Sequence, residues 1–169
     1  MKNTSKSKIA GKIISFIIVS FITTGLLFQI PAEAKNVSCK SLCSVALKAT
    51  GGSANLKYQS DNAIDFGALS ASGRKKVKSI QYVCDSKEVY SLCVLQAKNT
   101  AGAKALLKQL QKYKKNNCGS NYLQDYSSTE QNAFKNAVCG RKGTYVWYIA
   151  MSDTKTANTK GQDAIKKKL

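Results

Sequence analysis

Histidine is absent from this 169-residue chain, and that absence narrows the chemistry open to it. Without imidazole there is no ordinary general base near neutral pH and no mixed cysteine–histidine zinc site. Carboxylates are scarce too, because only nine Asp and Glu stand against 27 Lys and Arg. The chain also lacks a Cys-x-x-Cys pair, a Gly-x-Ser-x-Gly elbow and a lysine-bearing glycine loop for phosphate. We therefore expect a protein that is not an enzyme and that holds no cofactor and no metal.

The first 34 residues have the layout of a secretory signal peptide. An apolar run over residues 13–30 leads into Pro31-Ala32-Glu33-Ala34, whose small residues suit a signal peptidase. Four basic residues precede the run: Lys2, Lys6, Lys8 and Lys12. We expect cleavage near Ala34, which leaves a single domain over residues 35–169 that is secreted or associated with the outside of the cell envelope.

A leader that stays attached as a membrane anchor is the alternative. The apolar run has 18 residues, which approaches the roughly 20 that span a bilayer. Hydroxyl side chains at Ser15, Ser20 and Thr23 weaken this alternative. A lipid anchor is not expected, because Cys39 does not follow the run at the spacing of a lipobox.

The chain after the leader is strongly basic. The leader takes four of the 27 basic residues and one of the nine acidic ones, so 23 remain against 8 and the formal charge is +15. Such a charge attracts polyanions by summed Coulomb forces. Export argues against nucleic acid, so we expect an anionic cell-wall polymer or an acidic lipid surface as partner, with any protein partner unknown. The alternative is a solvated surface that only maintains solubility.

All six cysteines follow the leader, and an even number in an exported domain predicts disulfides. They are Cys39, Cys43, Cys84, Cys93, Cys118 and Cys139. Zinc is the alternative, but structural zinc sites usually combine two close cysteine pairs or a pair with histidines. Redox catalysis is a weaker alternative, since Cys39 and Cys43 are one residue too far apart for a Cys-x-x-Cys motif.

The cysteine pairing stays open among 15 connectivities. Our first choice joins Cys84 to Cys93 across a predicted hairpin, and our second joins Cys118 to Cys139. The two remaining cysteines then lie four residues apart on one predicted helix, which is awkward geometry for a disulfide.

Hydrophobic periodicity predicts one α+β domain, in which helices pack on a small, mainly antiparallel sheet made of a hairpin and a C-terminal strand. We expect the disulfides to brace this domain. The expected elements are helices over residues 38–49, 100–116 and 156–169, strands over 79–84, 90–97 and 144–151, and a short helix before residue 138. We expect residues 51–74 to be mostly loop and residues 140–143 to form a turn.

The helix expected over residues 100–116 carries the clearest candidate for binding. Apolar residues recur on one side at steps of three and four, at Ala103, Leu106, Leu107, Leu110 and Tyr113. The other side carries Lys104, Lys108 and Lys112, which could hold an anionic surface. The alternative is the ordinary solvated side of an amphipathic helix.

Several short motifs carry a resemblance to a known family. They are Cys93-Val94-Leu95-Gln96-Ala97-Lys98-Asn99, Leu123-Gln124-Asp125-Tyr126, the run from Asn136 to Val146, and Met151-Ser152-Asp153. Together they resemble the small exported bacterial proteins and lipoproteins of the family called domain of unknown function 4358, over roughly residues 78–169. The resemblance implies a strand at Asn136-Ala137-Val138, an exported compartment and no established activity. This chain departs from the family in its basic charge, its missing lipobox and Ser91, where relatives usually carry glutamate.

Taken together, these observations predict a secreted or cell-envelope protein that acts as a non-enzymatic binding or accessory module for anionic polymers or membrane surfaces. A secreted cationic effector, antimicrobial or toxin-like, is the alternative. It is disfavoured because the chain lacks a long lysine-rich amphipathic segment with exposed aromatic residues.

Overall fold

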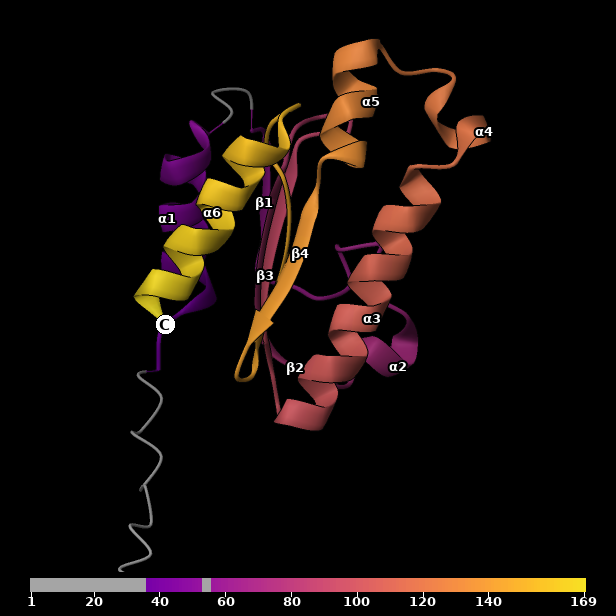
Figure 1. Ribbon diagram of the computed structural model, residues 1–169. Coiled ribbons are helices and arrows are strands. Elements are labelled where there is room, and N and C mark those ends of the chain that lie inside the picture. The colour runs from indigo at the N-terminus through magenta and orange to yellow at the C-terminus, as the bar shows by residue number, and fades with distance from the viewer. Residues whose placement is uncertain (1–35, 53–55) are drawn as a thin grey trace, which may run out of the picture. The chain divides into compact units, whose positions relative to one another are not determined.

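Five strands form one antiparallel sheet in the order β1-β2-β3-β5-β4, with helices on both faces (Figure 1). This computed structural model describes residues 36–52 and 56–169, all of which belong to one compact unit. The predicted leader and its cleavage site lie outside the described residues. The α+β class with an antiparallel sheet is confirmed.

The elements follow one another closely along the chain. In order they are α1 (Cys39–Thr50), β1 (Tyr58–Ser60), α2 (Ala71–Arg74), β2 (Val77–Cys84), β3 (Ser91–Ala97), α3 (Thr100–Asn117), α4 (Ser120–Leu123), α5 (Ser128–Lys135), β4 (Val138–Lys142), β5 (Tyr145–Ala150) and α6 (Lys155–Lys168).

The predicted hairpin is present as β2 and β3, and the predicted C-terminal strand is β5, which lies between β3 and β4. The turn expected over residues 140–143 is wrong, because β4 continues to Lys142 and only Gly143, at φ 58°, begins the reversal. Gly140 lies inside β4, where a Cβ atom would come within 2.5 Å of the Trp147 indole nitrogen. Glycine thus serves close packing here rather than a turn.

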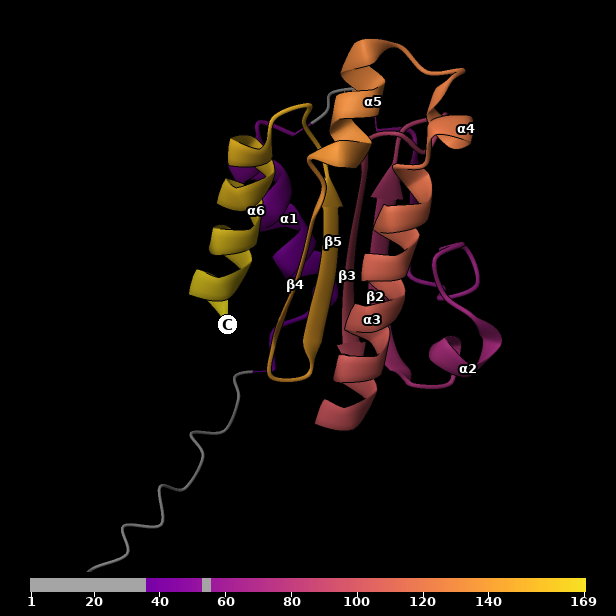
Figure 2. The same cartoon turned by 45° about the vertical axis from the view of Figure 1, so that its right-hand side comes forward.

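The helices divide between the two faces of the sheet (Figure 2). Successive residues of a strand point to opposite faces, so each strand supplies both layers. The layer under α3 includes Tyr82, Cys93, Leu95, Val146 and Tyr148. The layer under α1 and α6 includes Val83, Leu92, Val94, Trp147 and Ile149. Since both faces are covered, β5 is apolar along its whole length.

Local sequence explains where the main helices begin and how they pack. The Asn99 side chain accepts from the Gly102 amide at 2.7 Å and starts α3, while Gly51, at φ 83°, ends α1 as predicted. Gly161 of α6 faces α1, and a Cβ atom there would lie 2.6 Å from the Thr50 methyl. Helix α6 therefore approaches α1 more closely than a larger residue would allow.

The predicted disulfide bracing is wrong in this structure, in which all six cysteines are free. In the β2–β3 register Cys93 lies opposite Tyr82, and Cys84 lies opposite Ser91. The first predicted pair is therefore diagonal, and diagonal neighbours stand roughly 7–8 Å apart, beyond the usual Cα separation of a disulfide.

The other cysteines are also separated by their packing. Cys118 packs against a small cluster around Phe134, whereas Cys139 packs against the layer under α3. Cys39 and Cys43 turn toward β2, where the Cys43 sulfur lies 4.0 Å from the Gln81 carbonyl oxygen. Burial raises the pKa of Cys43 to about 12 and that of Cys139 to about 12, so these thiols stay protonated and act as small apolar residues.

Candidate functional site

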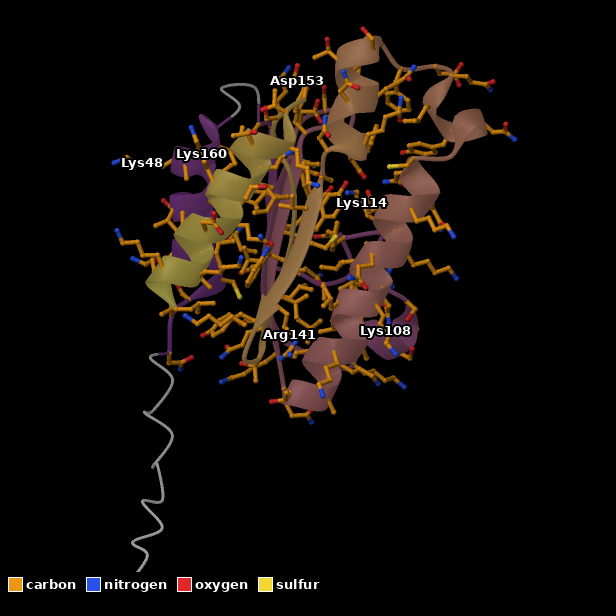
Figure 3. All side chains as sticks on the ribbon, viewed as in Figure 1. Lys48, Lys108, Lys114, Arg141, Asp153 and Lys160 are labelled. Carbon is orange, nitrogen blue, oxygen red and sulfur yellow. The ribbon has the colours of Figure 1, made fainter. Side chains whose placement is uncertain are left out.

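Most basic side chains of the described residues have no carboxylate partner. Over residues 36–52 and 56–169 there are two ion pairs, Lys87 with Glu130 at 2.9 Å and Lys166 with Asp163 at 3.3 Å. Figure 3 shows other lysines directed outward, among them Lys108 on α3. The positive charge is therefore mostly uncompensated at the surface.

The predicted amphipathic character of α3 is confirmed. Lys104, Lys108 and Lys112 are exposed, whereas Leu106 and Leu110 are fully buried against the sheet. Whether the three lysines bind an anionic surface stays a prediction. Lys114 differs from them, because its ammonium donates to the Ala137 carbonyl oxygen at 2.5 Å.

A hollow of about 350 Å³ lies at the start of α3 and is lined by three further lysines. Its walls are formed by Lys75, Lys76, Lys98, Asn99, Ala101 and Gly102. The β2–β3 pairing builds it, because Val77 lies opposite Ala97 and the Lys98 amide donates to the Lys76 carbonyl oxygen at 2.9 Å. Two segments more than twenty residues apart in the sequence thus bring their lysines to one place.

The electrostatics of this hollow favour an anion. The first amide groups of a helix have no partner within the helix, and its N-terminus carries a partial positive charge. The first turn of α3 contains no acidic residue, so the helix itself brings no carboxylate to that charge. The lysine ammonium groups add to this field.

A second hollow, of about 360 Å³, lies beside Lys112 on the same helix. Its other lining residues are Gly67, Ala68, Ser70, Gln109, Tyr113 and Asn116. The side-chain oxygen Oε1 of Gln109 accepts from the Ser70 backbone amide at 3.1 Å, which ties the segment before α2 to α3. We call the six lysines along α3 and around its start the α3 basic surface: Lys75, Lys76, Lys98, Lys104, Lys108 and Lys112.

Sequence reasoning found half of this surface and missed the rest. The stripe on α3 follows from helical periodicity, whereas Lys75, Lys76 and Lys98 come together only through strand pairing. One signal was present: Lys98 directly precedes the N-cap Asn99, where acidic residues are the favourable choice.

The remaining surfaces supply no assembled catalytic or metal centre. Within the part of the chain that the structure describes, no three His, Cys, Asp or Glu side chains lie close enough to share a metal ion. None of the described helices is long and apolar enough to cross a bilayer. The predicted apolar run of the leader lies outside the described residues.

Comparison with known proteins identifies no relative of this chain. No family model matches, and no match is found among curated proteins or among solved structures. The resemblance to the family called domain of unknown function 4358 therefore stays a prediction.

Proposed function

We propose that this protein is a non-enzymatic module of the cell exterior that binds phosphate-rich polymers or surfaces through its α3 basic surface. The observation that carries the proposal is the hollow at the start of α3, where Lys75, Lys76 and Lys98 surround a helix N-terminus whose first turn has no acidic residue. Lysine ammonium groups and the partial positive charge of a helix N-terminus both favour phosphate oxygens.

The strength of such binding follows from the number of lysines engaged. A lysine close to an acidic lipid surface contributes about 1 kcal/mol, so six lysines supply a useful affinity only when they act together. The lysine stripe and the hollow adjoin along α3, which supports one extended contact rather than six separate ones. Wall polymers and lipid headgroups share the phosphate chemistry, and the experiment separates them.

The test measures retention of the full chain on isolated cell walls and on vesicles of phosphatidylglycerol, with phosphatidylcholine vesicles as the neutral reference. Raising ionic strength from about 0.01 M to about 1 M shortens the Debye length from roughly 30 Å to roughly 3 Å, so the protein is expected to be released. Release that ignores salt contradicts the proposal.

Substitution locates the contact. We expect the triple change Lys75→Gln, Lys76→Gln and Lys98→Gln to weaken binding by about two orders of magnitude, at about 1 kcal/mol per lysine.

The matched control removes three exposed lysines of α6 by Lys155→Gln, Lys160→Gln and Lys167→Gln, with the same change in net charge. It is expected to weaken binding less than about tenfold. Equal losses in the two triple variants would mean that net charge alone, and not the α3 basic surface, holds the ligand. The vesicles should keep an enclosed dye, because leakage would instead favour the cationic effector.

A further inference from the structure

A second surface contains carboxylates and amides where the α3 basic surface contains lysines. Two adjoining hollows, of about 250 Å³ and about 450 Å³, lie between α1 and the β1 edge of the sheet. They share Lys40, Gln59 and Gln81, so they form one continuous groove, which we call the β1 groove. Around the shared residues its walls are Cys43, Ser44, Leu47, Tyr58, Ser60, Asp61, Asp65 and Val83.

A buried glutamine, Gln81, lies in the middle of the β1 groove. Gln81 is only 5% exposed and lies two residues before Val83, on the face of the sheet that packs against α1. Its amide nitrogen donates to the Ser60 carbonyl oxygen at 3.2 Å, which fixes the side chain beside β1. Burial of an amide is costly unless it is hydrogen-bonded, and this bond to Ser60 satisfies the Gln81 nitrogen within the protein.

The rim of the β1 groove holds a carboxylate and an aromatic ring in fixed positions. The Ser60 hydroxyl donates to Asp65 at 2.6 Å, and the Tyr58 hydroxyl donates to the same carboxylate. These two hydrogen bonds lower the pKa of Asp65, so it stays ionised as an acceptor. The Tyr58 ring meets Tyr82 edge to face, with centroids 6.2 Å apart, and remains 44% exposed.

The chemistry of the groove selects one class of ligand. A phosphate would be repelled by the charges of Asp61 and Asp65, and an apolar ligand would remove water from these carboxylates without replacing its hydrogen bonds. A hydroxyl-rich ring can donate to Asp65 and accept from Lys40, and glutamine amides can do both. Its C–H face can also pack on the exposed side of the Tyr58 ring.

We infer that the β1 groove binds a neutral sugar unit of an oligosaccharide, independently of the phosphate contact proposed for the α3 basic surface. Tyr58 supplies the apolar platform and Asp65 supplies an acceptor on one side of the β1 edge. Gln59 and Lys40 supply hydrogen bonds from the other side of that edge. The hollow of about 450 Å³ lies in the lower part of the roughly 300–1,000 Å³ range of small-molecule sites and the hollow of about 250 Å³ lies just below it, which suits one or two sugar rings.

The test is a titration of the isotopically labelled full chain with two uncharged probes, cellotetraose and the tetrasaccharide of β-1,4-linked N-acetylglucosamine, followed by amide NMR shifts. We expect at least one probe to give saturable shifts at β1 and the first half of α1, with a millimolar dissociation constant. No saturable shift from either probe up to about 10 mM, a free energy of only about 3 kcal/mol, overturns the inference.

Matched tyrosine variants keep the result specific. Tyr58→Ala should weaken the binding roughly tenfold, whereas Tyr122→Ala, which removes a tyrosine of similar exposure on α4, should leave it unchanged. Equal effects of the two variants overturn the inference. Retention on phosphatidylglycerol vesicles should be the same for Tyr58→Ala and the unaltered chain, so failure of one proposal is distinguishable from failure of the other.

Discussion

The α3 basic surface lies along a helix that covers one face of the sheet, whereas the β1 groove lies at the β1 edge, and the two differ in charge. The α3 basic surface gathers six lysines, and the first turn of its helix has no acidic residue. The β1 groove gathers Asp61 and Asp65 around two glutamines and one lysine. The net charge of the chain therefore does not predict the charge of each surface, because strand pairing and loop position decide which charged side chains lie close together.

Hydrogen bonding separates the two surfaces further. In the β1 groove, Ser60 and Tyr58 hold Asp65 in place, so its geometry is set before any ligand arrives. On α3 the exposed lysines extend into solvent, and an extended charged chain is not oriented by its neighbours. The β1 groove suits directional recognition, whereas the α3 basic surface suits attraction that tolerates different anions.

The largest effects are expected from changes in the core that supports both surfaces. Leu42 of α1 and Leu106 of α3 are both 0% exposed. Leu42→Ala and Leu106→Ala are each expected to lower the free energy of unfolding by about 2–5 kcal/mol, through lost burial and a residual cavity. Urea unfolding followed by Trp147 fluorescence and by far-UV circular dichroism should give coincident transitions. Loss of helical signal while Trp147 stays native would mean that the two layers unfold separately.

A smaller change should affect only the α3 side. Asn99→Ala removes the side-chain acceptor of the Gly102 amide and is expected to cost about 1 kcal/mol of stability. Because the cap also fixes the start of α3, binding to phosphatidylglycerol vesicles should weaken while sugar binding stays the same. Ser38→Ala, which removes the N-cap acceptor of α1, is the matched control and should leave vesicle binding unchanged. Parallel losses on vesicles for both variants would contradict a specific role for the α3 start.

The smallest expected effect is a change in stability at low pH. The hydrogen bond from Lys87, followed by those from Ser127, lowers the pKa of Glu130 from 4.5 to about 2. A lowered pKa in the folded state adds stability above pH 4.5, and this contribution is lost as the pH falls from 4.5 to 2. Glu130→Gln should therefore be slightly less stable than the unaltered chain at pH 6 and nearly equal to it at pH 2, as measured by urea unfolding. A stability difference that does not change with pH would contradict the pairing.

The elements with strong local signals could be predicted from the sequence. Helix α3 has both a cap at Asn99 and apolar residues at helical spacing, and β5 is a continuous apolar run, so both are confirmed near their expected bounds. The strand that the resemblance implied at Asn136-Ala137-Val138 is wrong in its bounds, because Asn136 is the C-cap of α5 and β4 begins only at Val138. Its continuation to Lys142 was missed because Gly140 and Arg141 have low strand propensity and pair only with β5. Strand β1, with three residues, exists only because β2 offers it an edge.

The candidate sites could be predicted only in part, for the same reason. The stripe of Lys104, Lys108 and Lys112 follows from one helix, and it was found. The hollow at the start of α3 and the β1 groove need residues from two or more segments, and no local pattern contains the register that joins them. The disulfide pairs failed likewise, because a shift of two residues in the β2–β3 register makes Cys84 and Cys93 diagonal neighbours.

The most direct test of the account maps a soluble polyanion on the full chain by amide NMR shifts during titration with inorganic polyphosphate at low ionic strength. The account predicts saturable shifts concentrated at Lys76, Lys98 and the first turn of α3, which disappear in high salt, while the β1 groove stays unshifted. Shifts spread evenly over α1, α3 and α6 would contradict it, because the phosphate would then follow the net charge and not a site.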